Sequence, residues 1–449
     1  MPEHYTERMN IVRSLLSCRA HVAFAFAFAC ALAAVPSHAQ NREESLTLGV
    51  VTFLSGPAAA ASGIPGRNGA ELVINAINEG RLPAPYQTMG LGGAKIEPIY
   101  LDEAGGNAKA VTETRNLVER RGAKIIAGFI SSGACQAVAP VVEELKVLTV
   151  FATCGTPRIF EEASRRYVFR SMGHTTPDGV AAARYLAQRP DKVIKFTGIN
   201  QNYAFGTDAW SDFSAATTAL VPGAAASDKP QWPKFLAGQY GTEISALQLD
   251  ESNLVYSSFW GGDLEAFVLQ AGARGLFQQK LTMLSFGADA YDKLGNRMPD
   301  GIIVGARGPY GLLVRDRNTA LNRWFVEQYN AKYGEYPNSA AYHYAQSVLA
   351  VKAAYDKAQR KAGRAPSVDE AVDAMIGMEF ESFSTTVRFA IGAGHQAVTE
   401  NGYAVTKFDT ANNRPGLTDI KFFPASCLFP PDGVAAEQWL KTGLRDSKC

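Results

Sequence analysis

Residues 124–152 read KIIAGFISSGACQAVAPVVEELKVLTVFA, and this stretch indicates one strand–helix–strand unit. Two short apolar runs, Lys124 to Ile130 and Val147 to Ala152, suit buried strands, and Cys135 to Leu145 between them suits a helix. Short links between alternating strands and helices require right-handed crossovers. We therefore expect a parallel sheet with helices on both faces.

The same alternation extends in both directions along the chain and then starts again. The first unit adds strands at 46–53 and 96–101 and helices at 68–78 and 108–120. The second has strands at 193–199, 253–259, 281–286 and 301–305, a helix after the turn at 203–206, and a helix at 263–273. Long helices follow at 318–333, 339–360 and 368–376, and then strands at 386–389 and 403–408. The pattern predicts an α/β protein with two units of similar build.

Composition excludes several classes of protein. The chain has 449 residues, of which 47% are hydrophobic and 19% are charged, so it can bury a core and is neither disordered nor a coiled coil. Its length predicts two or three domains. With a formal net charge of +1, it has no overall field that would attract nucleic acid or a membrane surface.

The N-terminus has the pattern of a secretory signal. Arg13 and Arg19 precede an apolar run from Val22 to Val35, and Ser37-His38-Ala39 places small residues at the cleavage positions. The run is shorter than the roughly 20 residues that span a bilayer as a helix. We expect residues 1–39 to be a signal peptide cleaved after Ala39, with a signal anchor as the alternative.

If the protein is exported, the four cysteines outside the signal peptide lie in an oxidising compartment, where disulfides form. Four cysteines allow three pairings, and proximity in sequence favours Cys135–Cys154 and Cys427–Cys449. Free buried thiols are the alternative.

A metal site and a nucleotide cofactor are not expected. No Cys-x-x-Cys pair is present, and the mature chain has three widely spaced histidines, His174, His343 and His395. The phosphate loop, the dinucleotide fingerprint, the zinc-protease motif and the Gly-x-Ser-x-Gly elbow are all missing from the sequence. Ser131-Ser132-Gly133, between a strand and a helix, leaves an exported hydrolase as an alternative.

The strand ends carry the candidate binding residues, because ligands of open parallel sheets bind beyond the carboxyl ends of the strands. In the first unit these ends are Ser55-Gly56, Ser131-Ser132-Gly133 and Thr153-Cys154-Gly155-Thr156, whose hydroxyl and N–H groups suit a carboxylate or amide oxygen. Helix capping is the alternative role of these residues.

The second unit places aromatic residues at equivalent points. Tyr203 and Phe205 precede Gly206, and Trp260 precedes Gly261, so their rings are candidates to close over an organic ligand. Core packing is the alternative. Asp289 and Asp178 are candidate partners for a ligand cation.

Several stretches, in this order, resemble the leucine/isoleucine/valine-binding family of periplasmic solute receptors of ABC importers. They are Phe53–Pro57, Gly69–Asn78, Asp102–Ala110, Ile126–Gly133, Ala137–Pro140, Tyr167–Arg170, Asn202–Gly206, Ala271–Leu276 and Asp300–Val304. The resemblance covers nearly all of the mature chain and is strongest before Arg170.

The resemblance implies the type I periplasmic binding protein fold, in which two Rossmann-like lobes with parallel sheets are joined by three hinge crossings. We place these crossings near Arg170, Gly305 and Val387. Lobe 1 then holds residues 40–170 and 305–387, and lobe 2 holds 171–304 and 388–449. The ligand would lie in the cleft between the lobes and be delivered to a membrane permease.

The resemblance also implies roles for single residues. Ser132 matches a family serine that holds the substrate carboxylate, Gly155 stands where the family has a threonine, and Thr153 is its possible substitute. Phe205 stands where the family has a tyrosine, with Tyr203 two residues earlier. The family's ammonium-binding glutamate would lie near Gly287, where the closest acid is Asp289.

The sequence thus predicts a monomeric periplasmic receptor that binds an amino acid, an amide or an aromatic or other carboxylic acid, without a cofactor and without catalysis. A binding protein that reports to a membrane receptor is the alternative of the same fold.

Overall fold

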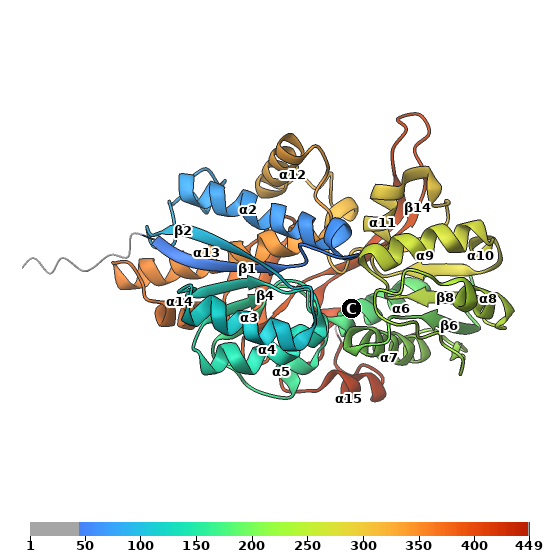
Figure 1. Ribbon diagram of the computed structural model, residues 1–449. Helices are drawn as coiled ribbons and strands as arrows, with labels where there is room; N and C mark the ends of the chain where they lie inside the picture. The colour runs from blue at the N-terminus through green and yellow to red at the C-terminus, as the bar shows by residue number, and fades with distance from the viewer. Residues whose placement is uncertain (1–44, 448) are drawn as a thin grey trace, which may run out of the picture. The chain divides into compact units, whose positions relative to one another are not determined.

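The computed structural model describes residues 45–447 and residue 449 (Figure 1). The predicted signal peptide and its cleavage after Ala39 lie outside the described residues.

The first sheet has eight strands, most of them parallel. In spatial order they are β11 (Glu379–Glu381), β12 (Thr386–Ile391), β13 (Gln396–Val398), β5 (Val168–Arg170), β4 (Leu148–Phe151), β3 (Ile125–Gly128), β1 (Ser45–Thr52) and β2 (Lys95–Asp102). The strands from β2 to β13 pair in parallel, and β11 and β12 extend the edge as an antiparallel hairpin. The central β3 and β4 are fully buried, as expected for a sheet covered on both faces.

Helices cover both faces of this sheet, and together they form the first lobe (Figure 1). The helix α2 (Ile64–Glu79) and the long α13 (Ser339–Ala362) lie on one face, and α3 (Asn107–Glu119) and α4 (Ser132–Glu144) lie on the other. A Cβ on Gly69 would lie 2.2 Å from the carbonyl oxygen of Ala341, so glycine is what lets α2 and α13 approach this closely.

The second sheet repeats the strand order of the first. Its seven strands are β15 (Leu417–Phe423), β14 (Asn401–Thr406), β10 (Ile303–Gly305), β9 (Leu281–Leu284), β8 (Leu254–Ser257), β6 (Lys195–Ile199) and β7 (Ala225–Ala226). The order β7-β6-β8-β9-β10 matches β2-β1-β3-β4-β5, and β14 and β15 complete the edge as antiparallel strands. The prediction of an α/β protein with two similar units is confirmed.

The second lobe consists of this sheet and its helices. On one face lie α6 (Thr175–Ala187) and α7 (Ala204–Leu220), and on the other lie α8 (Gly241–Leu249), α9 (Gly261–Ala273), α10 (Leu276–Gln279) and α11 (Gly287–Leu294). The remaining helical segments are α5 (Arg158–Glu161), α12 (Ala320–Tyr333), α14 (Val368–Met375), α15 (Ala436–Lys441), and the short η1 (Ala59–Gly63), η2 (Gly295–Arg297), η3 (Gly311–Leu313) and η4 (Ala425–Cys427).

The chain passes three times between the two sheets. It leaves the first sheet after β5, which ends at Arg170, and leaves the second after β10, which ends at Gly305. The third passage differs from the prediction. Val387 lies inside β12 and pairs with Phe380 of β11, so the crossing falls later, between Val398 and Asn401. The boundary of the first lobe moves with it, because β13 adds to the first sheet by pairing Gln396 with Arg170.

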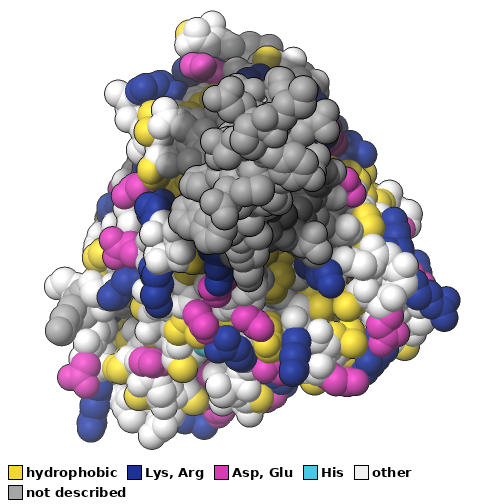
Figure 2. Space-filling model, turned by 90° about the vertical axis from the view of Figure 1, so that its left-hand side faces the viewer, with side chains coloured by type: hydrophobic (Ala, Val, Ile, Leu, Met, Phe, Trp, Pro, Cys, Tyr) yellow, Lys and Arg dark blue, Asp and Glu magenta, His cyan; other side chains and the backbone are white. Residues whose placement is uncertain are grey.

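The face of the molecule seen in Figure 2 shows no large patch of a single charge. Basic and acidic side chains are interspersed over the visible face (Figure 2), in keeping with a net charge of +1. Among the described residues, none of the helices combines the length and the apolar content that a membrane crossing needs. The same residues contain no cluster of three or more His, Cys, Asp or Glu side chains arranged to hold a metal ion.

Candidate functional site

A cavity of about 320 Å³ lies where the carboxyl ends of the two sheets face each other. Its wall residues come shortly after strand ends of both sheets: Ile130 after β3, Thr153 after β4, Tyr203 and Phe205 after β6, Trp260 after β8, Phe286 after β9 and Arg307 after β10. The start of α13 completes the wall with Ser339, Ala340 and His343. This is the position at which open α/β sheets bind ligands.

Aromatic rings make much of the wall. Phe205 and Phe286 meet edge to face with centroids 6.1 Å apart, and both are nearly fully buried. Trp260 donates a hydrogen bond from Nε1 to the Tyr203 hydroxyl over 2.8 Å, and Tyr203 stacks on Phe235. Because the two polar ring atoms bond each other, this part of the wall presents apolar surface to a ligand.

Arg307 supplies the buried positive charge of the cavity. Its side chain is 1% exposed, and Nε donates to Asp178 over 2.7 Å. The two terminal nitrogens donate to the carbonyl oxygens of Thr153, at 2.9 Å, and Gly173, at 3.5 Å. A guanidinium has five N–H groups, so two remain without a partner among the described residues.

The backbone holds Arg307 in a conformation that few residues other than glycine adopt. Its φ is 52°, in the left-handed region, and it is the second residue after β10, where the chain leaves the second sheet. Phe205 and Phe286 lie against the guanidinium, with the Cζ atom 5.0 and 5.3 Å from their ring centroids. Such local strain is tolerated where surrounding contacts enforce it and is concentrated at functional sites.

The buried centre holds a second guanidinium group besides that of Arg307. Arg170 is also fully buried, and it donates to the carbonyl oxygens of Cys154 and Thr156 rather than to a carboxylate. Burial lowers the pKa of Arg170 to about 9, and the nearby charge of Arg307 adds to that effect. Burial raises the pKa of Asp178, and Arg307 opposes that rise. Asp178 and Glu161 both supply negative charge near Arg170, so an anionic ligand is favoured chiefly by the two N–H groups of Arg307 that have no partner among the described residues.

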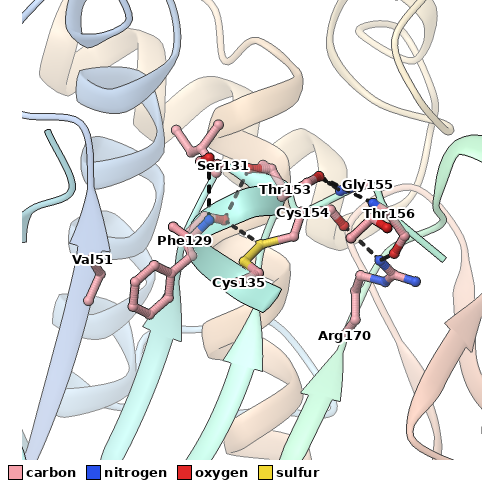
Figure 3. Close-up of a disulfide and its surroundings, with 12 residues drawn as sticks. Val51, Phe129, Ser131, Cys135, Thr153, Cys154, Gly155, Thr156 and Arg170 are labelled. Atoms are coloured by element: carbon pink, nitrogen blue, oxygen red, sulfur yellow. Dashed lines mark hydrogen bonds between the residues drawn. A yellow bond between two sulfur atoms is a disulfide. The ribbon is translucent and has the colours of Figure 1, made fainter. Parts of the chain in front are cut away.

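The loop after β4 is fixed by a disulfide and by internal hydrogen bonds (Figure 3). Cys135 of α4 is bonded to Cys154, and Ser132 Oγ accepts hydrogen bonds from the amides of Gly155 (3.0 Å) and Thr156 (3.2 Å). A Cβ on Gly155 would lie 2.5 Å from the Phe205 ring and 2.7 Å from a terminal nitrogen of Arg307. The carboxylate site expected at Ser132 and Gly155 is therefore filled by the protein itself.

The predicted site residues fall into three groups. Thr153, Tyr203, Phe205, Trp260 and Asp289 all line the cavity. Gly155 lies behind its wall against Phe205, and Ser132 is fully buried behind Gly155. Ser55 lies elsewhere: it lines a second cavity of about 790 Å³ that borders Tyr203, and it donates to Asp102.

The second predicted disulfide pair, Cys427 and Cys449, is also bonded.

Acidic residues occupy the outer rim of the cavity. Asp289 accepts hydrogen bonds from the amide, over 2.9 Å, and the hydroxyl of Ser339, and burial raises its pKa to about 6 despite these bonds. Glu265 pairs with Lys293 and Asp292 pairs with Arg315. Asp289, Glu265 and Asp292 thus have partners within the protein, unlike two N–H groups of Arg307, which have none among the described residues.

The two lobes touch each other around the cavity. The Asp289–Ser339 hydrogen bonds join α11 of the second lobe to α13 of the first. On another side, a Cβ on Gly262 would lie only 2.6 Å from the Pro57 carbonyl oxygen. Arg158 and Asp208 form an ion pair of 2.7 Å between α5 and α7. These contacts describe a closed arrangement of the lobes.

Arg307, Phe286 and His343 are among the cavity residues that the sequence did not predict. Arg307 follows a predicted strand, so its position after a strand end was a usable signal, and Phe286 is the last residue of another predicted strand. His343 lies within a helical pattern that gives no sign of facing a cavity.

Comparisons with known proteins agree with this geometry. Residues 45–413 match the model of a protein family that is described as "Periplasmic binding protein". A Rhodopseudomonas palustris solute-binding protein of an ABC transporter, solved with benzoate, has a TM-score of 0.72 and 21% identity, covering 87% of this chain and 99% of its own. A protein from R. palustris BisB5, solved with 3,4-dihydroxybenzoic acid, has a TM-score of 0.71 and 20% identity, covering 85% and 98%.

A branched-chain amino acid transporter substrate-binding protein from Streptococcus pneumoniae, solved with isoleucine, has a TM-score of 0.68 and 18% identity, covering 85% of this chain and 99% of its own. At these identities the likeness shows the fold. No curated protein matches the chain. The family match extends over most of the sequence and confirms the resemblance that the sequence motifs indicated: the chain belongs to the periplasmic binding protein family.

Proposed function

We propose that this protein is an exported solute receptor of an ABC importer and that it holds a small carboxylic acid with an apolar, preferably aromatic, body in the cavity between its lobes. The protein would be monomeric and periplasmic after cleavage following Ala39, and its closed form would be the state that the membrane permease reads.

The bonding of Arg307 is the observation that supports a carboxylate group on the ligand. Its two free N–H groups suit a carboxylate, whose acceptor geometry a guanidinium matches. Arg170 adds a second buried positive charge nearby, and Asp178 is the one carboxylate that Arg307 bonds directly. The structurally similar proteins were solved with benzoate, 3,4-dihydroxybenzoic acid and isoleucine, all of which carry a carboxyl group.

The rings of Phe205, Phe286 and Trp260 support an apolar ligand body. A cavity of about 320 Å³ is at the small end of the range for organic ligands, so a single ring with short substituents fits its size. Amino acids are less favoured, because Asp289, the acid nearest the expected ammonium position, is already bonded to Ser339.

The hydrolase alternative has little support at its proposed nucleophile. Ser132 is fully buried, and its oxygen accepts two amide hydrogen bonds, so it faces neither the cavity nor a histidine base. A receptor that signals to a membrane protein would use the same cavity. Stimulation of a partner permease's ATPase by the liganded protein would favour import over signalling.

Isothermal titration of the mature protein tests the proposal. We expect benzoate to bind at least about 30-fold more tightly than benzamide, its uncharged counterpart, since a buried charge partner contributes about 2 kcal/mol or more. Arg307→Gln should remove this preference, and Arg323→Gln, on the exposed surface of α12, should leave it unchanged.

Two results would contradict the proposal. One is equal affinity for carboxylates and their amides across a panel that also includes isoleucine and phenylacetate. The other is chemical conversion of a bound compound, which would indicate an enzyme.

A further inference from the structure

His343 contributes a buried imidazole to the wall of the cavity. It lies in the first turns of α13, lines the cavity and is fully buried. Neither Nδ1 nor Nε2 makes a hydrogen bond of ordinary geometry among the described residues, although the backbone of Arg307 lies near enough to favour the protonated ring. The Tyr310 ring packs against it edge to face at 4.5 Å, which fixes the imidazole plane without serving its nitrogens.

Two other buried polar side chains of the wall, Thr153 and Trp260, differ from His343 in this respect. The Thr153 hydroxyl donates to the carbonyl oxygen of Phe129, and Trp260 donates to Tyr203. Buried polar atoms in folded proteins are almost always paired, so an unpaired imidazole at the wall of a binding cavity points to a bond made with the ligand.

The chemistry of a neutral imidazole limits what that ligand group is. Burial lowers the pKa of His343 well below its ordinary value, and the charge of Arg307 lowers it further, against a smaller opposing effect of the Arg307 carbonyl. The ring therefore has one N–H donor and one acceptor nitrogen at neutral pH. An ammonium group is disfavoured beside Arg307, and a carboxylate serves only the N–H. A hydroxyl group both donates and accepts, so it can serve either ring nitrogen.

We propose that His343 determines specificity by hydrogen-bonding a hydroxyl group that the ligand carries in addition to its carboxylate. This inference rests on the proposed function, in which Arg307 binds the carboxylate. The substrate class is thereby narrowed from carboxylic acids in general to hydroxylated ones, such as phenolic acids.

Matched pairs of acids test the proposal by isothermal titration. The probes are benzoate with 2-, 3- and 4-hydroxybenzoate, and butyrate with 2-, 3- and 4-hydroxybutyrate. We expect at least one hydroxylated acid to bind the wild-type protein about tenfold more tightly than its parent, the effect of one buried hydrogen bond.

Two variants assign that preference to His343. His343→Leu should reduce the affinity ratio of the pair to about one while the affinity of the parent acid stays within about threefold. His343→Gln, whose amide both donates and accepts, should retain part of the ratio. His395→Leu is the matched control, because His395 is also buried but bonds the Val168 carbonyl away from the cavity.

The outcomes separate this inference from the proposed function. If the wild-type protein prefers carboxylates to amides but binds parent and hydroxylated acids equally, the role of His343 is overturned and the carboxylate site stands. The inference also fails if His343→Leu weakens both members of a pair alike, because that result indicates a purely structural role. Should no carboxylate bind, both proposals fall. Where His343→Leu does not fold, His343→Gln decides the assignment: an affinity ratio equal to that of the wild type would overturn the role of His343.

Discussion

At the scale of single residues, the buried charged side chains at the centre of the molecule are joined by hydrogen bonds. Asp178 accepts from Arg307 and, over 2.7 Å, from the side-chain amide of Asn401, so its carboxylate is bonded from two sides. Arg307 links this carboxylate to the loop after β4 through Thr153. The residue proposed to bind the ligand is therefore also a structural tie between the lobes.

We expect Arg307→Met to lower the free energy of unfolding by about 3–5 kcal/mol, because it leaves Asp178 buried without its cation. Asp178→Asn in the same chain should recover part of this loss. Urea unfolding at pH 7 measures both. Lowering the pH should shrink the deficit of the single variant, since a proton on Asp178 removes the unpaired charge. Equal destabilisation of the single and double variants would show that the charge is not the cause.

A second buried carboxylate, Glu103, predicts a pH dependence of stability. Both of its oxygens accept backbone amides, from Ile130 and Ser131, each at 2.8 Å. Burial nevertheless raises the pKa of Glu103 from 4.5 to about 8. Between these values the folded protein keeps a proton that the unfolded chain has lost, so the free energy of unfolding falls as the pH rises through this range.

Glu103→Gln should therefore flatten the decline in unfolding free energy between pH 5.5 and 7.5, by up to about 1.4 kcal/mol per pH unit. Urea unfolding at three pH values in this window provides the slopes. Glu144→Gln serves as the control, because Glu144 is exposed and its pKa is lowered by Arg115, so it stays ionised throughout the window. An unchanged slope in Glu103→Gln would rule Glu103 out as the source.

At the scale of elements, the two disulfides differ in what they hold. Cys135–Cys154 joins α4 to the loop that carries Thr153 and borders the cavity, and Cys427–Cys449 closes the C-terminal segment. Both disulfides close loops of similar length, because their cysteines are separated by 19 and 22 residues in the sequence. Their effects on stability through the unfolded chain should therefore be similar.

Replacing either pair with alanines should lower the free energy of unfolding by about 3 kcal/mol. Only the Cys135–Cys154 replacement should also weaken ligand binding, because it frees the loop that positions Thr153. Unfolding curves and titrations on the two double variants make the comparison. Equal loss of affinity in both would show that binding responds to overall stability rather than to this loop.

Most elements could be predicted from the sequence because their patterns are local. The buried parallel strands are short apolar runs, and α13 shows helical spacing of apolar residues over its length. The elements that were missed lack such patterns. β13 has three residues, too few to show a period, and β15 reads LTDIKFF, with charged residues at an exposed sheet edge. β13 pairs with β5, which lies far away in the sequence, and this is why the third crossing was placed too early.

The site was only partly predictable for a related reason. Tyr203, Phe205 and Trp260 follow strand ends, a position that the chain itself reveals. The wall position of His343 depends on how α13 packs against both lobes, and the covering of Gly155 by Phe205 depends on contacts across the cleft. Tertiary contacts of this kind leave no local pattern in a sequence.

At the scale of the whole molecule, closure of the lobes depends on a close backbone approach at Gly262. A methyl group there would lie 2.6 Å from the Pro57 carbonyl, and Pro57 belongs to the other lobe. The position is inside α9, where alanine is favoured over glycine. The substitution therefore penalises the closed arrangement without penalising the helix.

We expect Gly262→Ala to weaken ligand affinity about tenfold or more while the melting temperature of the unliganded protein stays the same or rises slightly. Gly272→Ala in the same helix is the control, because its Cβ would meet the Phe277 ring at an ordinary 3.8 Å. Titration and thermal unfolding of both variants give the answer. Unchanged affinity in Gly262→Ala would mean that binding does not require this contact.

The three passages of the chain between the sheets have a mechanical consequence. A joint made of three separate segments bends about one axis and resists twisting, so the halves of the empty protein keep facing each other. Little orientational freedom is then lost when they come together on a solute. The rate of ligand capture should therefore depend on how often a solute enters the cleft, because closure requires little reorientation of the lobes.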